Sequence, residues 1–313
     1  MALLVLAFGV RAHADLLVKA DQSIVRYDEV SGALLGVFAN GVVGTGLTFG
    51  PDGNLYVSDE INSRVLRFDA ATGAPLGTFA SGIDTPRDLA FGPDGNLYVS
   101  SLFSESVFRF HGSTGNALGS FATAPGLFPE GLAFGTGGDL VVSNGGGAEV
   151  LRFEGMTGVL IGTFASGGGL SGPTGLVFGP DGNLYVTSFG TNEVLRYDGA
   201  TGDLIGTFAS GGGLTGPSDL AFGPNGDLYV SSTFSNEVIR YDGATGALIG
   251  TFASGPELNF PSGLVFTPRA VPEPSGVALL GTGVLALLMG GGVARVRGGA
   301  RMTSASARAR TAA

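Results

Sequence analysis

A short phrase built around a phenylalanine recurs six times along the chain at nearly constant intervals. The copies lie 42 to 44 residues apart, at Phe49, Phe91, Phe134, Phe178, Phe222 and Phe266. A fixed period of this length is typical of repeat architectures, in which each unit buries its apolar face against the next. The repeat therefore limits the possible folds more strongly than any other feature of the sequence.

Each unit contains four short apolar runs that are too short for helices and rich in β-branched and aromatic residues. In the unit 220–263 these runs are 220–222, 228–230, 238–241 and 248–252. The first two runs are joined by GPNGD here and by GPDGN in three other units, and the last two by DGATG in two units and DAATG in one. Pro presets φ and Gly accepts a positive φ, so both connections predict tight hairpins between antiparallel strands.

The first and last repeats are incomplete, and their missing parts are complementary. Residues 15–39 supply a second, third and fourth strand without a first, whereas residues 262–268 supply a first strand with nothing after it. We therefore predict an all-β, six-bladed β-propeller over 15–268, made of five complete units and one composite blade. Pairing of the N-terminal strands with the C-terminal strand 264–266 would remove the open sheet edges of a linear array.

The N-terminal residues 1–14 have the pattern of a signal peptide. They combine an apolar run with a small-x-small site, which predicts cleavage between Ala14 and Asp15. Cleavage there would leave Asp15 at the start of the first predicted strand. The alternative is that 1–14 form a buried N-terminal strand.

The C-terminal segment has three parts in a fixed order: a Pro-Glu-Pro motif, an uncharged apolar stretch and a basic tail. They are the linker 269–275 with Pro272, Glu273 and Pro274, the stretch 276–294, and the tail 295–313 with Arg295 and Arg297. The stretch is about the minimum length for a transmembrane helix, and arginines after it are typical of a cytoplasmic flank.

This order of parts resembles the PEP-CTERM sorting signal of Gram-negative bacteria. The resemblance implies export, transient anchoring in the inner membrane, and removal of the tail by an exosortase-type enzyme. The body would then stay at the cell surface or in an exopolysaccharide matrix. The alternative is an ordinary C-terminal membrane anchor.

The charge of the predicted propeller limits its partners. Residues 15–268 contain 25 acidic and 9 basic side chains, and the whole chain contains no cysteine. Such an acidic ring would repel nucleic acid and anionic membranes. The lack of cysteine excludes disulfides and thiolate chemistry.

The units DLAFGPDGNLYVS (88–100) and NEVLRYDGATGDLIGTFAS (192–210) resemble NHL-type repeats and, more loosely, gluconolactonase-like six-bladed propellers. The first resemblance implies an interaction platform. The second implies a lactone hydrolase that holds a divalent metal in the central channel. A fold of this kind supports several functions, so the site residues have to decide between them.

Three ladders of residues recur in all six units, and what recurs in every blade is expected to be scaffold. The aromatic ladders are Phe38, Phe79, Phe121, Phe164, Phe208 and Phe252 in the fourth strand, and Tyr27, Phe68, Phe110, Phe153, Tyr197 and Tyr241 in the third. Both predict packing between neighbouring blades. The third ladder is Arg26, Arg67, Arg109, Arg152, Arg196 and Arg240. We expect each arginine to pair with a carboxylate or carbonyl of an adjacent blade.

Residues that differ between blades are the candidates for a site. Carboxylates and an amide stand just before the first strand or just after the second, where loops gather at the channel mouth: Asp59, Asp88, Glu130, Asn144 and Asp219. Lys19 is expected at the position that Asp59 has in the next unit. Oxygen donors of this kind suit Ca²⁺ or Mg²⁺. Glu130, Asn144 and Asp219 also match the family's metal positions broadly, and the alternative is a solvated polar mouth.

Five phenylalanines stand in loops on the same predicted face: Phe103, Phe128, Phe189, Phe234 and Phe260. They predict either an exposed apolar patch for a partner or plugs that fill gaps between blades. His111 lies in a turn between third and fourth strands, so the propeller offers no Ser-His-Asp arrangement.

Three hypotheses for the function follow. The first is an exported, surface-displayed scaffold without catalysis, whose loop face binds a matrix glycan or protein. The second is a metal-dependent lactonase or related hydrolase centred on Glu130, Asn144 and Asp219. The third is a purely structural spacer.

Overall fold

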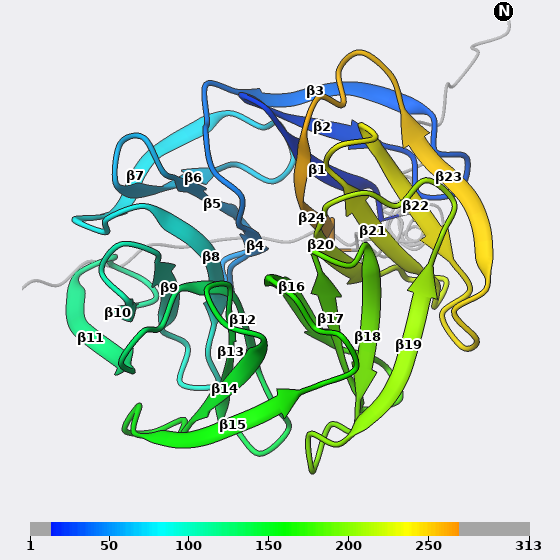
Figure 1. Ribbon diagram of the computed structural model, residues 1–313. Coiled ribbons are helices and arrows are strands. Elements are labelled where there is room, and N and C mark those ends of the chain that lie inside the picture. Colours follow the sequence, from blue (N-terminus) through cyan, green and yellow to red (C-terminus); the bar gives the residue numbers. More distant parts are fainter. Residues whose placement is uncertain (1–13, 269–313) are drawn as a thin grey trace, which may run out of the picture. The chain divides into compact units, whose positions relative to one another are not determined.

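Each repeat unit forms one four-stranded antiparallel sheet, and six such sheets surround a central axis in the computed structural model (Figure 1). The structure describes residues 14–268. Blades 1 to 5 contain strands β4–β7, β8–β11, β12–β15, β16–β19 and β20–β23, and the closing blade contains β24, β1, β2 and β3. The predicted six-bladed propeller is confirmed.

The strands occupy four concentric positions in the ring. The innermost are β4 (Leu47–Phe49), β8 (Pro86–Phe91), β12 (Pro129–Phe134), β16 (Pro173–Phe178), β20 (Pro217–Phe222) and β24 (Pro261–Phe266). The second are β5 (Leu55–Asp59), β9 (Leu97–Ser101), β13 (Leu140–Asn144), β17 (Leu184–Ser188), β21 (Leu228–Ser232) and β1 (Leu16–Ala20). The third are β6 (Arg64–Phe68), β10 (Ser106–Phe110), β14 (Glu149–Phe153), β18 (Glu193–Tyr197), β22 (Glu237–Tyr241) and β2 (Ser23–Tyr27). The outermost are β7 (Pro75–Ser81), β11 (Ala117–Thr123), β15 (Leu160–Ser166), β19 (Leu204–Ser210), β23 (Leu248–Ser254) and β3 (Leu34–Asn40).

Ring closure takes place where the two ends of the described chain meet. Strand β24 pairs antiparallel with β1, with Leu264 opposite Val18 and Phe266 opposite Leu16. Thr267 extends this pairing, because its backbone N–H donates to the carbonyl of Asp15 and its Oγ1 accepts from the N–H of Asp15. The composite blade predicted from the two partial repeats is confirmed.

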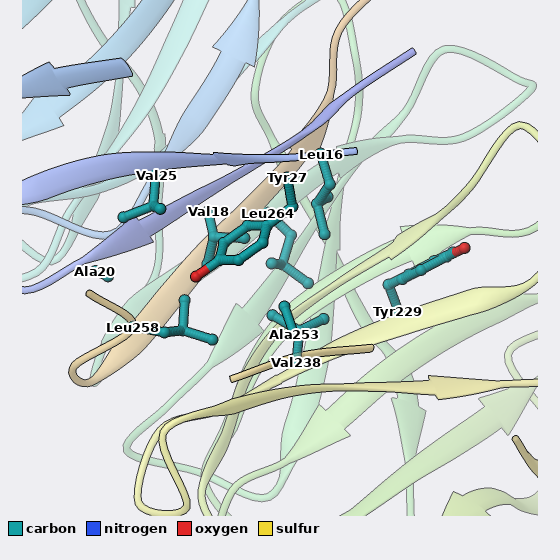
Figure 2. Packing of buried hydrophobic residues seen from close by; sticks show 10 residues of the cluster. All are labelled: Leu16, Val18, Ala20, Val25, Tyr27, Tyr229, Val238, Ala253, Leu258 and Leu264. Carbon is teal, nitrogen blue, oxygen red and sulfur yellow. The ribbon is translucent and has the colours of Figure 1, made fainter. Parts of the chain in front are cut away.

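The apolar core is divided among the six interfaces between neighbouring blades. At the closing interface, Leu16, Val18 and Leu264 pack against Tyr229 and Ala253 of blade 5 (Figure 2). Every residue of the second strands is buried, which explains their continuous apolar runs. The aromatic ladders of the third and fourth strands lie in or against these clusters, as predicted.

A tyrosine in the second strand adds a specific contact at four of the interfaces. Tyr185 stacks edge-on against Phe208 of its own blade and Phe222 of the next, with ring centroids 4.7 and 5.0 Å apart. The same arrangement recurs around Tyr56, Tyr98 and Tyr229. Each tyrosine thus joins the outer strand of one blade to the inner strand of its neighbour.

The arginine ladder is structural, but its partner differs from the prediction. Each arginine pairs with an aspartate of its own blade, as Arg152 does with Asp139 and Arg240 with Asp227. The prediction of a partner in the adjacent blade is therefore wrong. The reason is strand pairing, because the aspartate lies one or three residues before the second strand, which pairs with the strand of the arginine in the same sheet.

Residues 1–13 and 269–313 lie outside the described residues. They include most of the predicted signal peptide, the Pro-Glu-Pro motif at 272–274, the apolar stretch 276–294 and the basic tail. Within the described residues, no helix has the length and apolarity needed to cross a membrane. Ala14 and Asp15 are described, and both are buried in the closing blade.

Candidate functional site: the channel mouth

A cavity of about 340 Å³ opens where the innermost strands begin. Residues at the starts of all six strands provide its polar lining, and the loops β13–β14, β15–β16 and β17–β18 cover its sides with Gly145, Gly172 and Phe189. We call this space the mouth cavity. Of the predicted metal-ligand residues, it brings together Asp88, Glu130 and Asp219.

Asp88 and Asp219 each connect two neighbouring blades. The Oδ1 of Asp88 accepts from the N–H of Leu89, and its Oδ2 accepts from the N–H of Leu132 in the next blade, both at 2.8 Å. Asp219 makes the same two bonds to Leu220 and Leu264, at 2.8 and 2.7 Å. Four of the other inner strands have glycine at this position, at Gly46, Gly131, Gly175 and Gly263.

Burial raises the pKa of both carboxyl groups despite these hydrogen bonds. The pKa of Asp88 rises to about 6, chiefly through desolvation. That of Asp219 rises to about 7 through desolvation and through repulsion by Asp88. The two groups stand in opposite blades of the ring, so their charges meet across the cavity.

A chain of ion pairs runs along one side of the mouth. Arg87 places Nη1 3.0 Å from Oε1 of Glu60 in blade 1 and Nε 3.2 Å from Oε2 of Glu130 in blade 3. Desolvation raises the pKa of Glu130 to about 7, although Arg87 opposes the shift. Arg87 and Glu60 were not among the predicted site residues. The signal for Arg87 was available, because it is the only basic residue just before a first strand.

Asp59 and Asn144 do not line the mouth cavity. Asp59 accepts from Asn62 and pairs with Arg64 at 2.7 Å, within its own blade. The Oδ1 of Asn144 accepts from the N–H of Phe128 at 2.9 Å. Both residues end second strands, which the innermost strands separate from the axis.

Lys19 lies one position earlier in the blade than the sequence alignment predicted. It occupies the strand position of Ser58, and its Nζ donates to the carbonyl of Asp21. Burial lowers its pKa to about 8. The negative charges of Asp21, Glu60 and Asp59 oppose this shift.

The described residues contain no group of three or more His, Asp or Glu side chains that could hold a metal ion. In the mouth, backbone N–H groups and Arg87 already engage the carboxylate oxygens of Asp88, Asp219 and Glu130. The calcium site therefore remains a prediction from the sequence alone. Calorimetric titration with Ca²⁺ tests whether the metal binds.

The sequence left open whether the five loop phenylalanines are exposed or fill gaps between blades, and the structure shows both arrangements. Phe103, Phe128, Phe234 and Phe260 are exposed, with 68, 40, 57 and 53% of their surface accessible. Phe189 is half-buried at the cavity wall and stacks edge-on against Phe234, with ring centroids 5.5 Å apart. Gly216 makes room for this pair, because a Cβ there would lie 2.7 Å from the Phe234 ring.

Ile61 belongs to the same set of loop residues, although the sequence analysis missed it. It lies in the β5–β6 loop, which corresponds to the loops that carry Phe103 and Phe234, and it is 71% exposed. Ile61 is aliphatic, so the pattern of loop phenylalanines does not include it. We call Ile61, Phe103, Phe128, Phe234 and Phe260 the apolar loop set.

Comparison with solved structures places the propeller among known folds. A chain from a nidogen/laminin complex aligns with a TM-score of 0.69 at 18% identity, over 82% of this chain and 99% of that one. A protein of unknown function from Bacteroides caccae aligns with a TM-score of 0.66 at 14% identity, over 82% and 99%. A catalytically inactive histidine-to-alanine variant of virginiamycin B lyase from Staphylococcus aureus, with quinupristin, aligns with a TM-score of 0.59 at 15% identity. The alignment covers 82% of this chain and 93% of that one.

These likenesses establish the fold. At such low identity they do not extend to function. No protein-family model matches the chain, and no curated protein matches its sequence.

Proposed function

We propose that this chain is an exported scaffold without catalysis, and that it binds a matrix protein or glycan through the loop face around the mouth cavity. The observation that carries the proposal is the apolar loop set, whose five large side chains are exposed on loops of one face. Exposed apolar groups around a concave site are a mark of protein-binding surfaces. A protein partner is therefore favoured over a glycan.

Structural neighbours include a chain from a complex between two proteins as well as a lyase. The lyase variant described as inactive has lost a histidine. In the described part of this chain the sole histidine is His111, which is exposed in the β10–β11 hairpin, on the face away from the mouth. This placement supports the binding function over a histidine-dependent reaction at the mouth.

Replacing three exposed phenylalanines tests the binding face. We expect the triple variant Phe103→Ser, Phe234→Ser and Phe260→Ser to lose at least tenfold in capture of its partner from matrix extract, because central aromatic side chains dominate interface energies. The measurement is quantitative pull-down with the purified chain. The side chains are exposed, so the melting temperature should change little.

In the matched control, Ser replaces Ile205 and Ile249. These isoleucines are 46 and 52% exposed on the outer strands β19 and β23. It should capture the partner as the wild type does. Protease treatment of the extract should abolish capture if the partner is a protein, whereas glycosidase treatment should do so if it is a glycan. Equal capture by the triple variant and the wild type would refute the proposed face.

The location of the protein is part of the proposal. We expect that the N-terminal signal exports the chain, that an exosortase-type enzyme removes its tail, and that the propeller then lies at the cell surface or in the matrix. Replacing Glu273 by Ala should leave the full-length form in the membrane fraction, as seen by mass and cell fractionation. Release of a shortened form from this variant would contradict the sorting proposal.

A further inference from the structure

The hydroxyl groups that line the mouth cavity can act as hydrogen-bond acceptors for a ligand. Thr45 and Thr174 donate their hydroxyl protons to backbone carbonyls of the next blade, at 3.0 and 2.9 Å. The Oγ of Ser218 lies 2.5 Å from Oγ1 of Thr233, which itself donates to a carbonyl of the closing blade. Each hydroxyl proton is therefore used within the wall, and lone pairs are left for a ligand.

The backbone donors at the mouth are also engaged. Four N–H groups at the starts of the inner strands donate to serine hydroxyls of the second strands, at 2.7 to 2.9 Å: Gly46 to Ser58, Asp88 to Ser100, Gly131 to Ser143 and Asp219 to Ser231. Donors are thus scarce in the cavity, and Arg87 is the one cationic side chain that lines it among the described residues.

The charges of the mouth are not balanced within the described chain. Arg87 is compensated by Glu60 and Glu130. Buried carboxylates elsewhere, at Asp15 and Asp59, pair with an arginine. Asp88 and Asp219 have no such ion pair among the described residues and are stabilised by backbone N–H groups only. A desolvated carboxylate without a counter-ion favours the approach of a cation.

The cavity also has an apolar wall for the carbon part of a ligand. The Phe189 ring lines one side and is supported by Phe234. Glycines at four of the six inner strand starts let neighbouring inner strands approach closely, because a Cβ there would lie 2.0 to 2.7 Å from a backbone atom of the next blade. An aromatic face beside anionic acceptors is a suitable environment for an organic ammonium group.

We propose that the mouth cavity binds a protonated primary amine, with its ammonium group between Asp88 and Asp219 and its carbon chain against Phe189. Calcium needs six to eight converging oxygen ligands. The described residues hold no group of three or more His, Asp or Glu side chains that could contribute them, whereas one ammonium group needs only about three acceptors. The amine can come from a lysine side chain or from an amino sugar. Amine binding uses residues of the mouth cavity and not the apolar loop set. It is therefore a function additional to the proposed partner binding.

Calorimetric titration of the full chain at pH 7 with two matched ligand pairs tests the proposal. Nα-acetyl-lysine methylamide is compared with its norleucine counterpart, and glucosamine is compared with glucose. We expect an amine to bind at least tenfold more tightly than the partner that lacks the ammonium group, and the pair with the tighter amine identifies the source. Equal binding within both pairs would overturn the proposal.

The pH dependence provides a second readout. The pKa values of Asp88, Asp219 and Glu130 are raised to about 6, 7 and 7, so these groups lose protons between pH 5 and pH 7. Arg87, which pairs with Glu60 and Glu130 beside them, stays cationic in this range. Amine affinity should therefore rise about tenfold from pH 5 to pH 7. An affinity that is flat or falls over this range would count against the site.

Variants separate this site from the proposed function. Asp219→Asn should lower amine affinity about tenfold, whereas the double variant Phe103→Ser and Phe260→Ser, which leaves Phe189 and its neighbour Phe234 in place, should keep at least half of it. The wild-type ligand pairs decide the question even if Asp219→Asn unfolds. Calcium titrated alone should give no saturable heat. A calcium signal that blocks the amine would replace the amine by a metal and overturn the proposal.

Discussion

A chain shortened to end at Asn259 should lose its cooperative thermal unfolding transition, whereas a chain that ends at Pro268 should keep it. The shorter chain lacks β24, the strand that closes the ring. The expected cost is at least about 5 kcal/mol of unfolding free energy, because burying each large apolar side chain contributes roughly 1.5–3 kcal/mol. A loss of this size approaches the total stability of many domains, about 5–15 kcal/mol.

Three contacts explain the size of this effect. Leu264 is buried in the apolar cluster between the closing blade and blade 5 (Figure 2). Phe266 stacks edge-on against Tyr229 of blade 5, with ring centroids 5.0 Å apart. The backbone N–H of Leu264 also donates a hydrogen bond to Oδ2 of Asp219. Without β24, the inner edge of β1 would be left without a partner strand.

Scanning calorimetry and near-ultraviolet circular dichroism of the two shortened chains measure the effect. The two chains differ by nine residues, so the comparison isolates the strand. A sharp transition at an unchanged temperature in the chain that ends at Asn259 would show that ring closure contributes little to stability.

The second large effect is expected at the tyrosine that joins two blades. Tyr185→Ala should lower the free energy of unfolding by about 3–5 kcal/mol, as is typical for removal of a large buried ring. The lost contacts are those to Phe208 and Phe222. For a protein of this size the change should lower the melting temperature by about 10 °C.

Tyr185→Phe is the matched control, because it keeps the ring and removes only the hydroxyl group. That hydroxyl donates to Oδ2 of Asp181 at 2.9 Å, so the control should cost about 0.5–1.5 kcal/mol. Chemical denaturation of both variants gives the two values. If the two substitutions cost the same amount, the hydrogen bond within the blade and not the aromatic stacking between blades would account for the contribution of Tyr185.

The apolar periodicity of the sequence was sufficient to predict most of the fold. The spacing of Phe49 to Phe266 gave the number of blades, and the partial repeats at the two ends gave the closure that β24 and β1 make. These predictions succeed because each blade repeats the same local signals. Apolar runs of strand length and turns with Pro and Gly specify four strands per unit, irrespective of the neighbouring blades.

The candidate site was only partly predictable. The sequence placed Asp88, Glu130 and Asp219 at the mouth correctly, because their position just before a first strand determines the end of the ring at which they lie. It also placed Asp59 and Asn144 there, whereas both end second strands that lie behind the innermost strands and do not line the cavity. A shift of one residue in the alignment misplaced Lys19.

The sequence by itself determined the repeat, the closed six-bladed ring and the end of the ring at which the variable residues gather, because these depend on local strand and turn signals. Only the tertiary structure decided that Arg87 bridges Glu60 and Glu130, that Asp88 and Asp219 clamp neighbouring blades, and that the loop phenylalanines are largely exposed. The physical reason is that such contacts join different blades. Their distances depend on the twist and packing of whole sheets, which no single repeat encodes.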